Sequence, residues 1–436
     1  MNKKRLLTVM GNSGWQKVVA PNAAFSFLPF NIQRLNDTFR VDPIFDLQTY
    51  SGVVVNKTYY VKMASEGGND AASGADEANA LATISAAILK ADVDRVMVKA
   101  GIYNGAAGMN AYVPNHDLEV IGYGGDVICP TDIIGLAFSA VDNHYEAARP
   151  TGIHVVYDSS VLDDFGDYVP LTYVVSAAEV EATAGTWFWG TDVLYVHTVD
   201  SRAPDADIHC SYGTRTYNAV HNTANTYYIE GLHFYGSLIP FILDSTSPDC
   251  KLYLKNCSFK YGSNNTFTWS GLRIGGGGEI IAENCVFARC AQDGVQINVK
   301  TAQSPNVALI NCDSRSHGLT VNTNNNSNGV SRHGPGNSVI INSRLYNTYG
   351  PNILDVNDGT YTWMLGCTCT DSVGTAFRHN YGISNASFMW LDRCTATGVA
   401  ADNQLYASVG ANLYYRKMNP STPTKKEITG GVVNVY

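Results

Sequence analysis

The chain has 436 residues, of which 45% are hydrophobic and only 15% charged, and its formal net charge is −9. So apolar a composition excludes a disordered chain, and the acidic balance argues against nucleic acid as a partner, because clustered Lys and Arg bind phosphate backbones. No run of 18 apolar residues occurs, so no membrane-spanning helix is expected.

The N-terminal region lacks the repeat found later in the chain. Its apolar run at residues 6–10 is too short for a secretory signal, so we expect a protein made in a cytoplasm and not secreted by the general route. Residues 1–60 are predicted to form a separate segment, used either for attachment to another protein or as a cap.

Residues 76–91 predict an amphipathic helix. Leu81, Ile84 and Ile88 fall on one face at helical spacing, and Asp76 is placed to cap the N-terminus. A helix here is expected to cover the open end of the fold that follows and to block edge pairing. Farther along, residues 185–197 read as a hairpin that packs on the side of that fold, and residues 416–436 as a C-terminal tail.

A repeat of 24–31 residues runs from residue 257 to residue 394. Each period carries short apolar strands broken by Gly and Asn, which is typical of one coil of a parallel β-helix with ~4.8 Å between coils. One column of small inward residues is formed by Cys257, Cys285, Cys312, Cys367 and Cys394. These cysteines are interpreted as buried hydrophobes rather than disulfides or zinc ligands. The asparagines at 256, 284, 311 and 342 are predicted to form an amide ladder at a bend.

The segments 64–74 and 98–103, the hairpin and the Asn-Cys coils resemble the pectate-lyase-like superfamily of right-handed parallel β-helices over residues 61–415. That resemblance implies an all-β fold that hosts lyases, hydrolases and non-catalytic spikes, so function must be argued from the site. An acidic chain rich in Asn, Gly and Tyr, without a signal peptide, is similar to bacteriophage tailspikes.

The tailspike resemblance implies a depolymerase of bacterial surface polysaccharide, capsule or O-antigen, acting as a glycoside hydrolase or polysaccharide lyase. It also implies a homotrimer located in the virion tail, attached through the N-terminal segment, with no nucleic acid and no membrane insertion. One alternative is a non-catalytic receptor-binding spike. Another is a bacterial cell-surface enzyme, which predicts a secretion signal that the sequence lacks.

The second strand of each coil is expected to carry the site, because alternation sends every other side chain outward. The inward set is taken as Leu272, Ile274, Val295, Ile297, Leu354, Val356, Phe377 and Leu405. The outward set is then Arg273, Gln296, Asn298, Ser331, His333, Asp355, Arg378 and Tyr406. A register error of one residue would reverse any of these strands.

At the centre of this face we expect His333, Asp355 and Arg378 on neighbouring coils. A carboxyl and an imidazole supply general acid–base catalysis, and a guanidinium binds a uronate carboxylate. The alternative is a ladder of ion pairs that only stabilises the fold.

Further candidates border this face. The Asn-rich loop 322–328 is expected to wall a groove or to be a solvated turn, and Asp293 and Asp371 are additional candidate carboxylates. Tyr349 and Tyr406 could stack on sugar rings or simply suit a strand. No cofactor is expected; Ca²⁺ at the acidic turn 163–167 is an option without specific ligand spacing.

Overall fold

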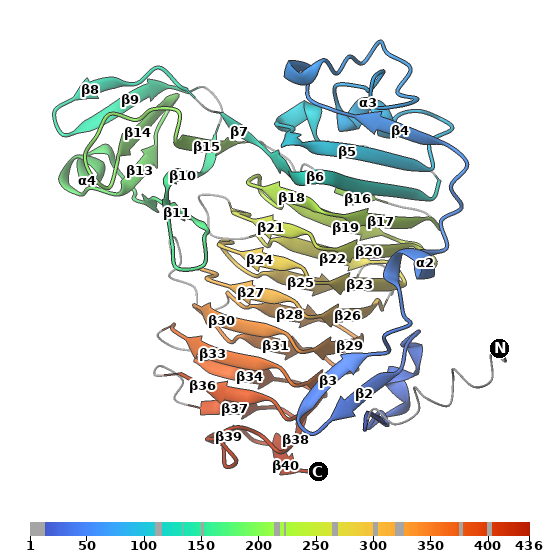
Figure 1. The fold of residues 1–436 in the computed structure, drawn as a ribbon. Helices are drawn as coiled ribbons and strands as arrows, with labels where there is room; N and C mark the ends of the chain where they lie inside the picture. The colour runs from blue at the N-terminus through green and yellow to red at the C-terminus, as the bar shows by residue number, and fades with distance from the viewer. Residues whose placement is uncertain are drawn as a thin grey trace.

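The structure is a computed structural model and describes residues 14–109, 116–133, 135–149, 152–212, 219–221, 224–263, 269–299, 304–318, 327–374, 378–398 and 403–436. The chain winds into a right-handed parallel β-helix, as the repeat predicted, with a lateral module and an N-terminal segment against its sides (Figure 1). No helix among the described residues is long and apolar enough to cross a membrane.

Each coil contributes strands to three parallel sheets, here called sheets I, II and III. Sheet I contains β4 (Thr58–Val61), β5 (Arg95–Ile102), β6 (Leu118–Pro130), β17 (Thr226–Glu230), β20 (Lys251–Lys255), β23 (Glu279–Glu283), β26 (Asn306–Ile310), β29 (Gly336–Ile341), β32 (Thr360–Leu365), β35 (Phe388–Asp392), β38 (Asn412–Arg416) and β40 (Val432–Val435).

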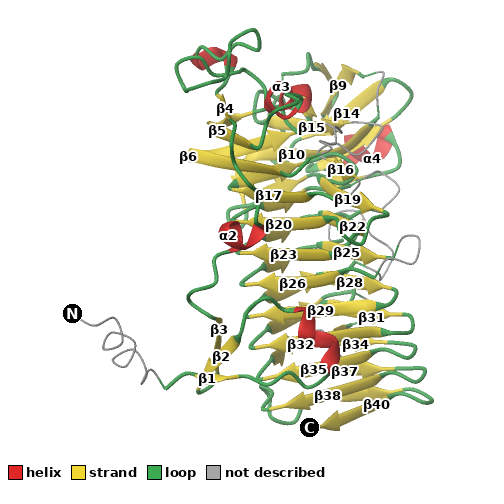
Figure 2. Cartoon of the chain, turned by 90° about the vertical axis from the view of Figure 1, so that its right-hand side faces the viewer, coloured by secondary structure: helices red, strands yellow, loops and turns green. Residues whose placement is uncertain are grey.

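Sheet II starts from the second halves of β5 and β6 and continues through β18 (Leu232–Tyr235), β21 (Ser258–Lys260), β24 (Val286–Ala288), β27 (Asp313–Arg315), β30 (Arg344–Thr348), β33 (Thr368–Ser372) and β36 (Thr395–Thr397). Sheet III contains β16 (Ala219–His221), β19 (Phe241–Ser245), β22 (Leu272–Gly276), β25 (Val295–Asn298), β28 (Val330–His333), β31 (Ile353–Val356), β34 (His379–Ile383), β37 (Asn403–Ala407) and β39 (Lys425–Glu427). Figure 2 shows the strands of sheets I and III stacked coil upon coil.

The repeat positions have the structural roles that their spacing predicted. All five column cysteines are buried and unoxidised. The amide of Asn284 donates to Asn256 at 3.3 Å and that of Asn311 donates to Asn284 at 3.3 Å. These asparagines turn the chain from sheet I to sheet II with φ near 55° (Asn256 55°, Asn284 54°, Asn311 53°), a left-handed conformation that Asn tolerates better than most side chains do.

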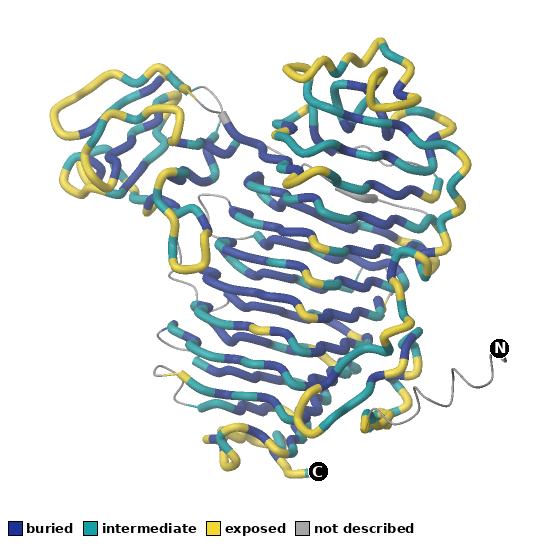
Figure 3. The backbone as a smooth tube through the Cα atoms, in the orientation of Figure 1, coloured by how far each residue is buried: buried dark blue, intermediate teal, exposed yellow. Residues whose placement is uncertain are grey.

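The N-terminal segment packs on the outer face of sheet I. It contains β1 (Gln16–Lys17), a 3₁₀ turn (Ala23–Phe27), β2 (Ile32–Leu35), β3 (Thr38–Val41) and α2 (Leu47–Ser51). The ring of Phe25 lies 5.5 Å from that of Trp363, and both belong to an apolar cluster that joins this segment to sheet I. Figure 3 shows that buried residues dominate the stacked coils, whereas exposed ones gather at the loops.

The lateral module leaves the β-helix after β6 and returns before β16 (Figure 1). It contains β7 (Asp132–Ile133), β8 (Ser139–Val141), β9 (His144–Ala148), β10 (Ile153–Leu162), β11 (Tyr168–Pro170), β12 (Thr172–Tyr173), α4 (Ala177–Ala182), β13 (Thr186–Trp189), β14 (Val193–His197) and β15 (Ile208–Tyr212). β13 and β14 pair antiparallel, so the predicted hairpin is present.

Two boundaries differ from the sequence expectation. The helix predicted over 76–91 is only α3 (Ile84–Ile88), and Thr83 is its N-cap. Asp76 does not cap it, because its carboxylate accepts from the backbone of Asn79 and holds a turn instead. Residues 416–436 are more than a tail, since β39 pairs with β37 and β40 with β38 as a further coil.

Candidate functional site

Six of the predicted site residues meet on the outer face of sheet III, across β22, β25 and β28. Arg273, Gln296 and Ser331 occupy one column of paired positions. Asn298 and His333 are paired in the neighbouring column, and Asp293 lies two residues before β25. The alternation proposed from sequence is therefore correct for these three strands. The core-facing positions are Leu272 and Ile274 in β22, Val295 and Ile297 in β25, and Val330 and Arg332 in β28.

A hydrogen-bond network starts at the Asp293 carboxylate and runs along the outer face of β25. Asp293 accepts from the Ser331 hydroxyl at 2.7 Å, from the Asn328 backbone N–H at 2.8 Å and from the Asn328 side chain at 3.0 Å. Gln296 donates to Asp293 at 3.4 Å and accepts from the Asn298 amide at 3.2 Å. The network fixes the amides of Gln296 and Asn298 before any ligand arrives.

Asp293 itself is fully enclosed. Burial raises its pKa to about 6, although the hydrogen bonds from Ser331, Asn328 and Gln296 act in the opposite direction. A carboxyl with no exposed surface cannot touch a polysaccharide directly. We therefore interpret Asp293 as a positioning residue for the amides on the outer face.

His333 carries a partly buried imidazole at the end of β28. Burial lowers the pKa of its imidazole, so the ring is neutral at neutral pH. Its Nε2 has no hydrogen-bond partner among the described residues. A buried polar atom without a partner costs free energy, and such atoms are found where a ligand or solvent completes the site.

Asp244 in β19 is a residue of this face that the sequence interpretation missed. It lies in the same column as Asn298 and His333, with Gly275 between it and Asn298. A Cβ at Gly275 would come within 3.2 Å of the Asp244 carboxylate, so the glycine leaves room for that carboxylate. The alternating pattern of β19 could have identified Asp244, because it resembles that of the later strands. The sequence interpretation began its series of outward residues at β22, one coil after β19.

An aromatic and cationic pair borders the network. The Arg273 guanidinium lies over the Trp269 ring, 5.5 Å from its centroid. Most of the proposed loop 322–328 lies outside the described residues, which resume at residue 327.

Asp355 is the main error of the sequence interpretation. Its strand β31 has the opposite register, so Ile353 and Asp355 point into the core while Leu354 and Val356 point outward. Asp355 is 1% exposed and is paired in register with the equally buried Arg332. The register is anchored where β31 begins, because Asn352 donates to Asn380 at 2.8 Å and to the Thr370 carbonyl at 2.8 Å.

The remaining candidates do not join the network. Asp371 lies at the end of β33 in sheet II with φ of 51°, so it does not share a face with the candidate site. Arg378 precedes β34 and is half-buried, on a lower coil of sheet III. Tyr406 points outward from β37 and stacks on His379 at 4.4 Å, and Tyr349 is half-buried at a corner after β30. Phe377 lies outside the described residues.

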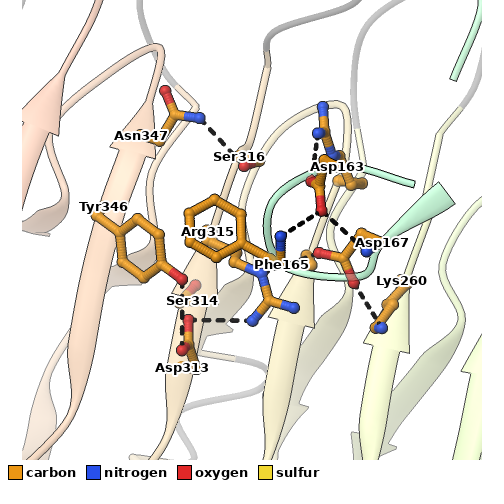
Figure 4. A network of polar contacts seen from close by, with 12 residues as sticks. Asp163, Phe165, Asp167, Lys260, Asp313, Ser314, Arg315, Ser316, Tyr346 and Asn347 are labelled. Carbon is orange, nitrogen blue, oxygen red and sulfur yellow. Dashed lines mark hydrogen bonds and ion pairs between the residues drawn. The ribbon is translucent and has the colours of Figure 1, made fainter. Parts of the chain in front are cut away.

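The acidic turn suggested for Ca²⁺ has another role. Asp163 pairs with Arg289, and Asp167 pairs with Lys260 at 2.6 Å and Arg315 at 2.9 Å (Figure 4). Because these carboxylates are paired with cations on the coils of sheet II, the turn holds the lateral module against the β-helix. No cluster of metal-ligating side chains occurs within the part of the chain that the structure describes.

No protein-family model and no curated protein matches this sequence. Among solved structures, the complex of XylC with xylose matches at 12% identity with a TM-score of 0.47, covering 85% of this chain and 70% of that one. Pectate lyase Pel9A matches at 13% identity with a TM-score of 0.47, covering 86% and 78%. The tailspike protein gp49 from Pseudomonas phage LKA1 matches at 10% identity with a TM-score of 0.23, covering 89% and 78%. At such identities the likeness concerns the fold alone.

Proposed function

We propose that the outer face of sheet III, from β19 to β28, binds an acidic bacterial surface polysaccharide and cleaves it by β-elimination. The observation that carries this proposal is His333, a neutral imidazole whose Nε2 is unpartnered among the described residues. It lies beside a fixed set of amides, in the same column as Asp244.

In the proposed reaction, His333 takes the C5 proton of a uronate, and the C4–O glycosidic bond breaks as a C4–C5 double bond forms. The departing oxygen takes a proton from solvent. Arg273 binds the uronate carboxylate and makes the C5 proton more acidic. Arg273 lies two strands and two residues from His333, a Cα separation of roughly 12 Å at ~4.8 Å per strand and ~3.3 Å per residue. The long Arg273 side chain points outward and can extend across that gap toward a sugar at His333.

Hydrolysis is less well supported by the same geometry. Glycosidases use two carboxyls that flank the scissile bond, at ~5–5.5 Å or ~6.5–9.5 Å from each other. Among described residues of β19, β22, β25 and β28, Asp244 is the sole outward carboxylate, and Asp293 is enclosed.

The second candidate function is binding without turnover, as in a receptor-binding spike. The hydrogen bonds to the Asp293 carboxylate favour this second function, because they make the face rigid. The sequence resemblance supports further parts of the proposal, which hold for either candidate function. They are a tailspike role, a virion tail location, attachment through residues 1–60 and a side-by-side homotrimer.

The deciding experiment incubates the full chain with a panel of bacterial capsules and O-antigens. New reducing ends together with absorbance of unsaturated uronate support elimination. Reducing ends without that absorbance would mean hydrolysis, and binding without either product would support the spike.

A further inference from the structure

A second cleft lies away from sheet III, between the lateral module and the outer face of sheet II. It has a volume of about 420 Å³, which is within the ~300–1,000 Å³ typical of ligand pockets. Its floor comes from sheet II, with His233, Ser258 and Val286, and its wall from the module, with Leu162 and Tyr168. The module stands beside the upper coils in Figure 1, and the turn between β10 and β11 extends down alongside them.

The wall of this cleft is fixed in place. The turn between β10 and β11 is tied to sheet II by the three ion pairs of Asp163 and Asp167 described above (Figure 4). Asp167 is 1% exposed, so its pairs with Lys260 and Arg315 are shielded from water and are screened less by salt than surface pairs are. The cleft is therefore formed before a ligand binds.

One tyrosine ring presents a rigid flat surface at the wall. The half-buried Tyr168 ring stacks on Tyr157 at 5.6 Å and 8°. Tyr157 stacks in turn on Tyr261 at 4.7 Å, and its hydroxyl donates to the buried Asp132. Because the stack behind it is anchored, Tyr168 keeps its ring orientation without a ligand.

Polar groups lie across the floor. His233 Nδ1 lies 2.9 Å from the Ser258 hydroxyl, and its Nε2 lies 3.5 Å from the Asp126 carboxylate. Burial lowers the pKa of His233, which favours a neutral ring. Lys260 is already paired with Asp167 at 2.6 Å, whereas Asp126 is 81% exposed. Among the described lining residues the cleft therefore offers a ligand no unpaired cation.

We propose that this cleft is a binding site for a neutral saccharide. A flat tyrosine ring suits the apolar C–H face of a sugar, and the imidazole, the hydroxyl and the carboxylate suit its hydroxyl groups. The exposed Asp126 carboxylate disfavours uronates and phosphates. The site is separate from the face of sheet III and does not rest on the function proposed there.

The test is binding of the full chain to an array of neutral and uronate-containing bacterial oligosaccharides, followed by titration with the best neutral ligand. Tyr168→Ala should weaken that binding by about tenfold, the scale of one lost aromatic stack. Tyr168→Phe keeps the ring and should bind as the wild type does. Tyr145→Ala is the matched control, a half-buried tyrosine of β9 in the same module that does not line the cleft.

Three results would overturn the proposal. The first is that no neutral oligosaccharide binds, and the second is that Tyr168→Ala binds like Tyr168→Phe. The third is that the binding lost in Tyr168→Ala is binding of a uronate oligosaccharide. His333→Ala should leave the neutral ligand bound, so failure of this site and failure of the sheet III proposal give different results.

Discussion

Asp355→Asn tests the register of β31, where the structure reverses the sequence interpretation. Burial raises the pKa of Asp355 to about 6, whereas an unfolded Asp titrates near ~3.9. The folded state therefore holds the proton more tightly. The resulting stabilisation is fully present below about pH 4 and is lost as the pH rises through about 6. A difference of ~2 pKa units corresponds to about 3 kcal/mol.

Asp355→Asn keeps the shape of the side chain and removes its titration. Between about pH 4 and about pH 7, the wild type should therefore lose about 3 kcal/mol of unfolding free energy that this variant does not lose. Part of the wild-type decline will remain, because burial also raises the pKa of Asp293 to about 6. The measurement is urea unfolding at a series of pH values, followed by tryptophan fluorescence.

Asp358→Asn is the control, because this carboxylate is exposed on the same coil. If Asp355→Asn and the wild type lose stability with pH in parallel, the carboxyl faces solvent and β31 has the register first expected from sequence. The inward register also predicts that Asp355→Asn leaves the rate of polysaccharide cleavage unchanged.

Three further predictions concern the fold. Cys285 and Cys312 are buried and reduced, so neither should react with a thiol reagent without denaturant, and rapid native labelling of both would contradict the inner column. Asn311→Ala should destabilise the protein by about 1–2 kcal/mol in urea unfolding, because Ala tolerates the left-handed turn poorly and the ladder bond is lost; a midpoint equal to that of the wild type would argue against the ladder. Phe25→Ala should cost about 3–5 kcal/mol in the same assay, since its ring is 2% exposed against sheet I; a negligible effect would mean that the N-terminal segment is detached from the coils.

The fold could be predicted because its signals are periodic. A left-handed residue followed by a small buried one recurs from coil to coil, as Asn-Cys at Cys257, Cys285 and Cys312. Another placement would bury the Asn amide without partners or expose the small apolar residue. The same regularity gave the correct outward set on β25 and β28. The extra coil formed by β39 and β40 has no Asn-Cys element, so the sequence offered no such signal for it.

The error at Asp355 has a physical cause. Alternation alone favours the strand register that puts Leu354 and Val356 inside, because two aliphatic residues outweigh one. The structure instead buries Ile353 and Asp355, with Asn352 bonded to the next coil and Arg332 as the neighbour of the carboxylate. The register of β31 therefore depends on contacts between coils, and the residue pattern within one strand carries no information about those contacts.

The second cleft could not be predicted from the sequence at all. Its wall and floor come from residues about 100 positions apart, and the ion pairs that hold them join Asp163 and Asp167 to three different coils. The same acidic turn read in isolation suggested a calcium site.

The most direct test of the central claim is the rate at which unsaturated uronate appears when an acidic capsule polysaccharide is cleaved by the wild type, by His333→Ala and by Asp355→Asn. Elimination on the face of sheet III predicts that His333→Ala lowers this rate by roughly 10²-fold or more, on the scale of a lost general base, while Asp355→Asn keeps it. An unchanged rate in His333→Ala, or a loss in Asp355→Asn without a loss of stability, would contradict the account.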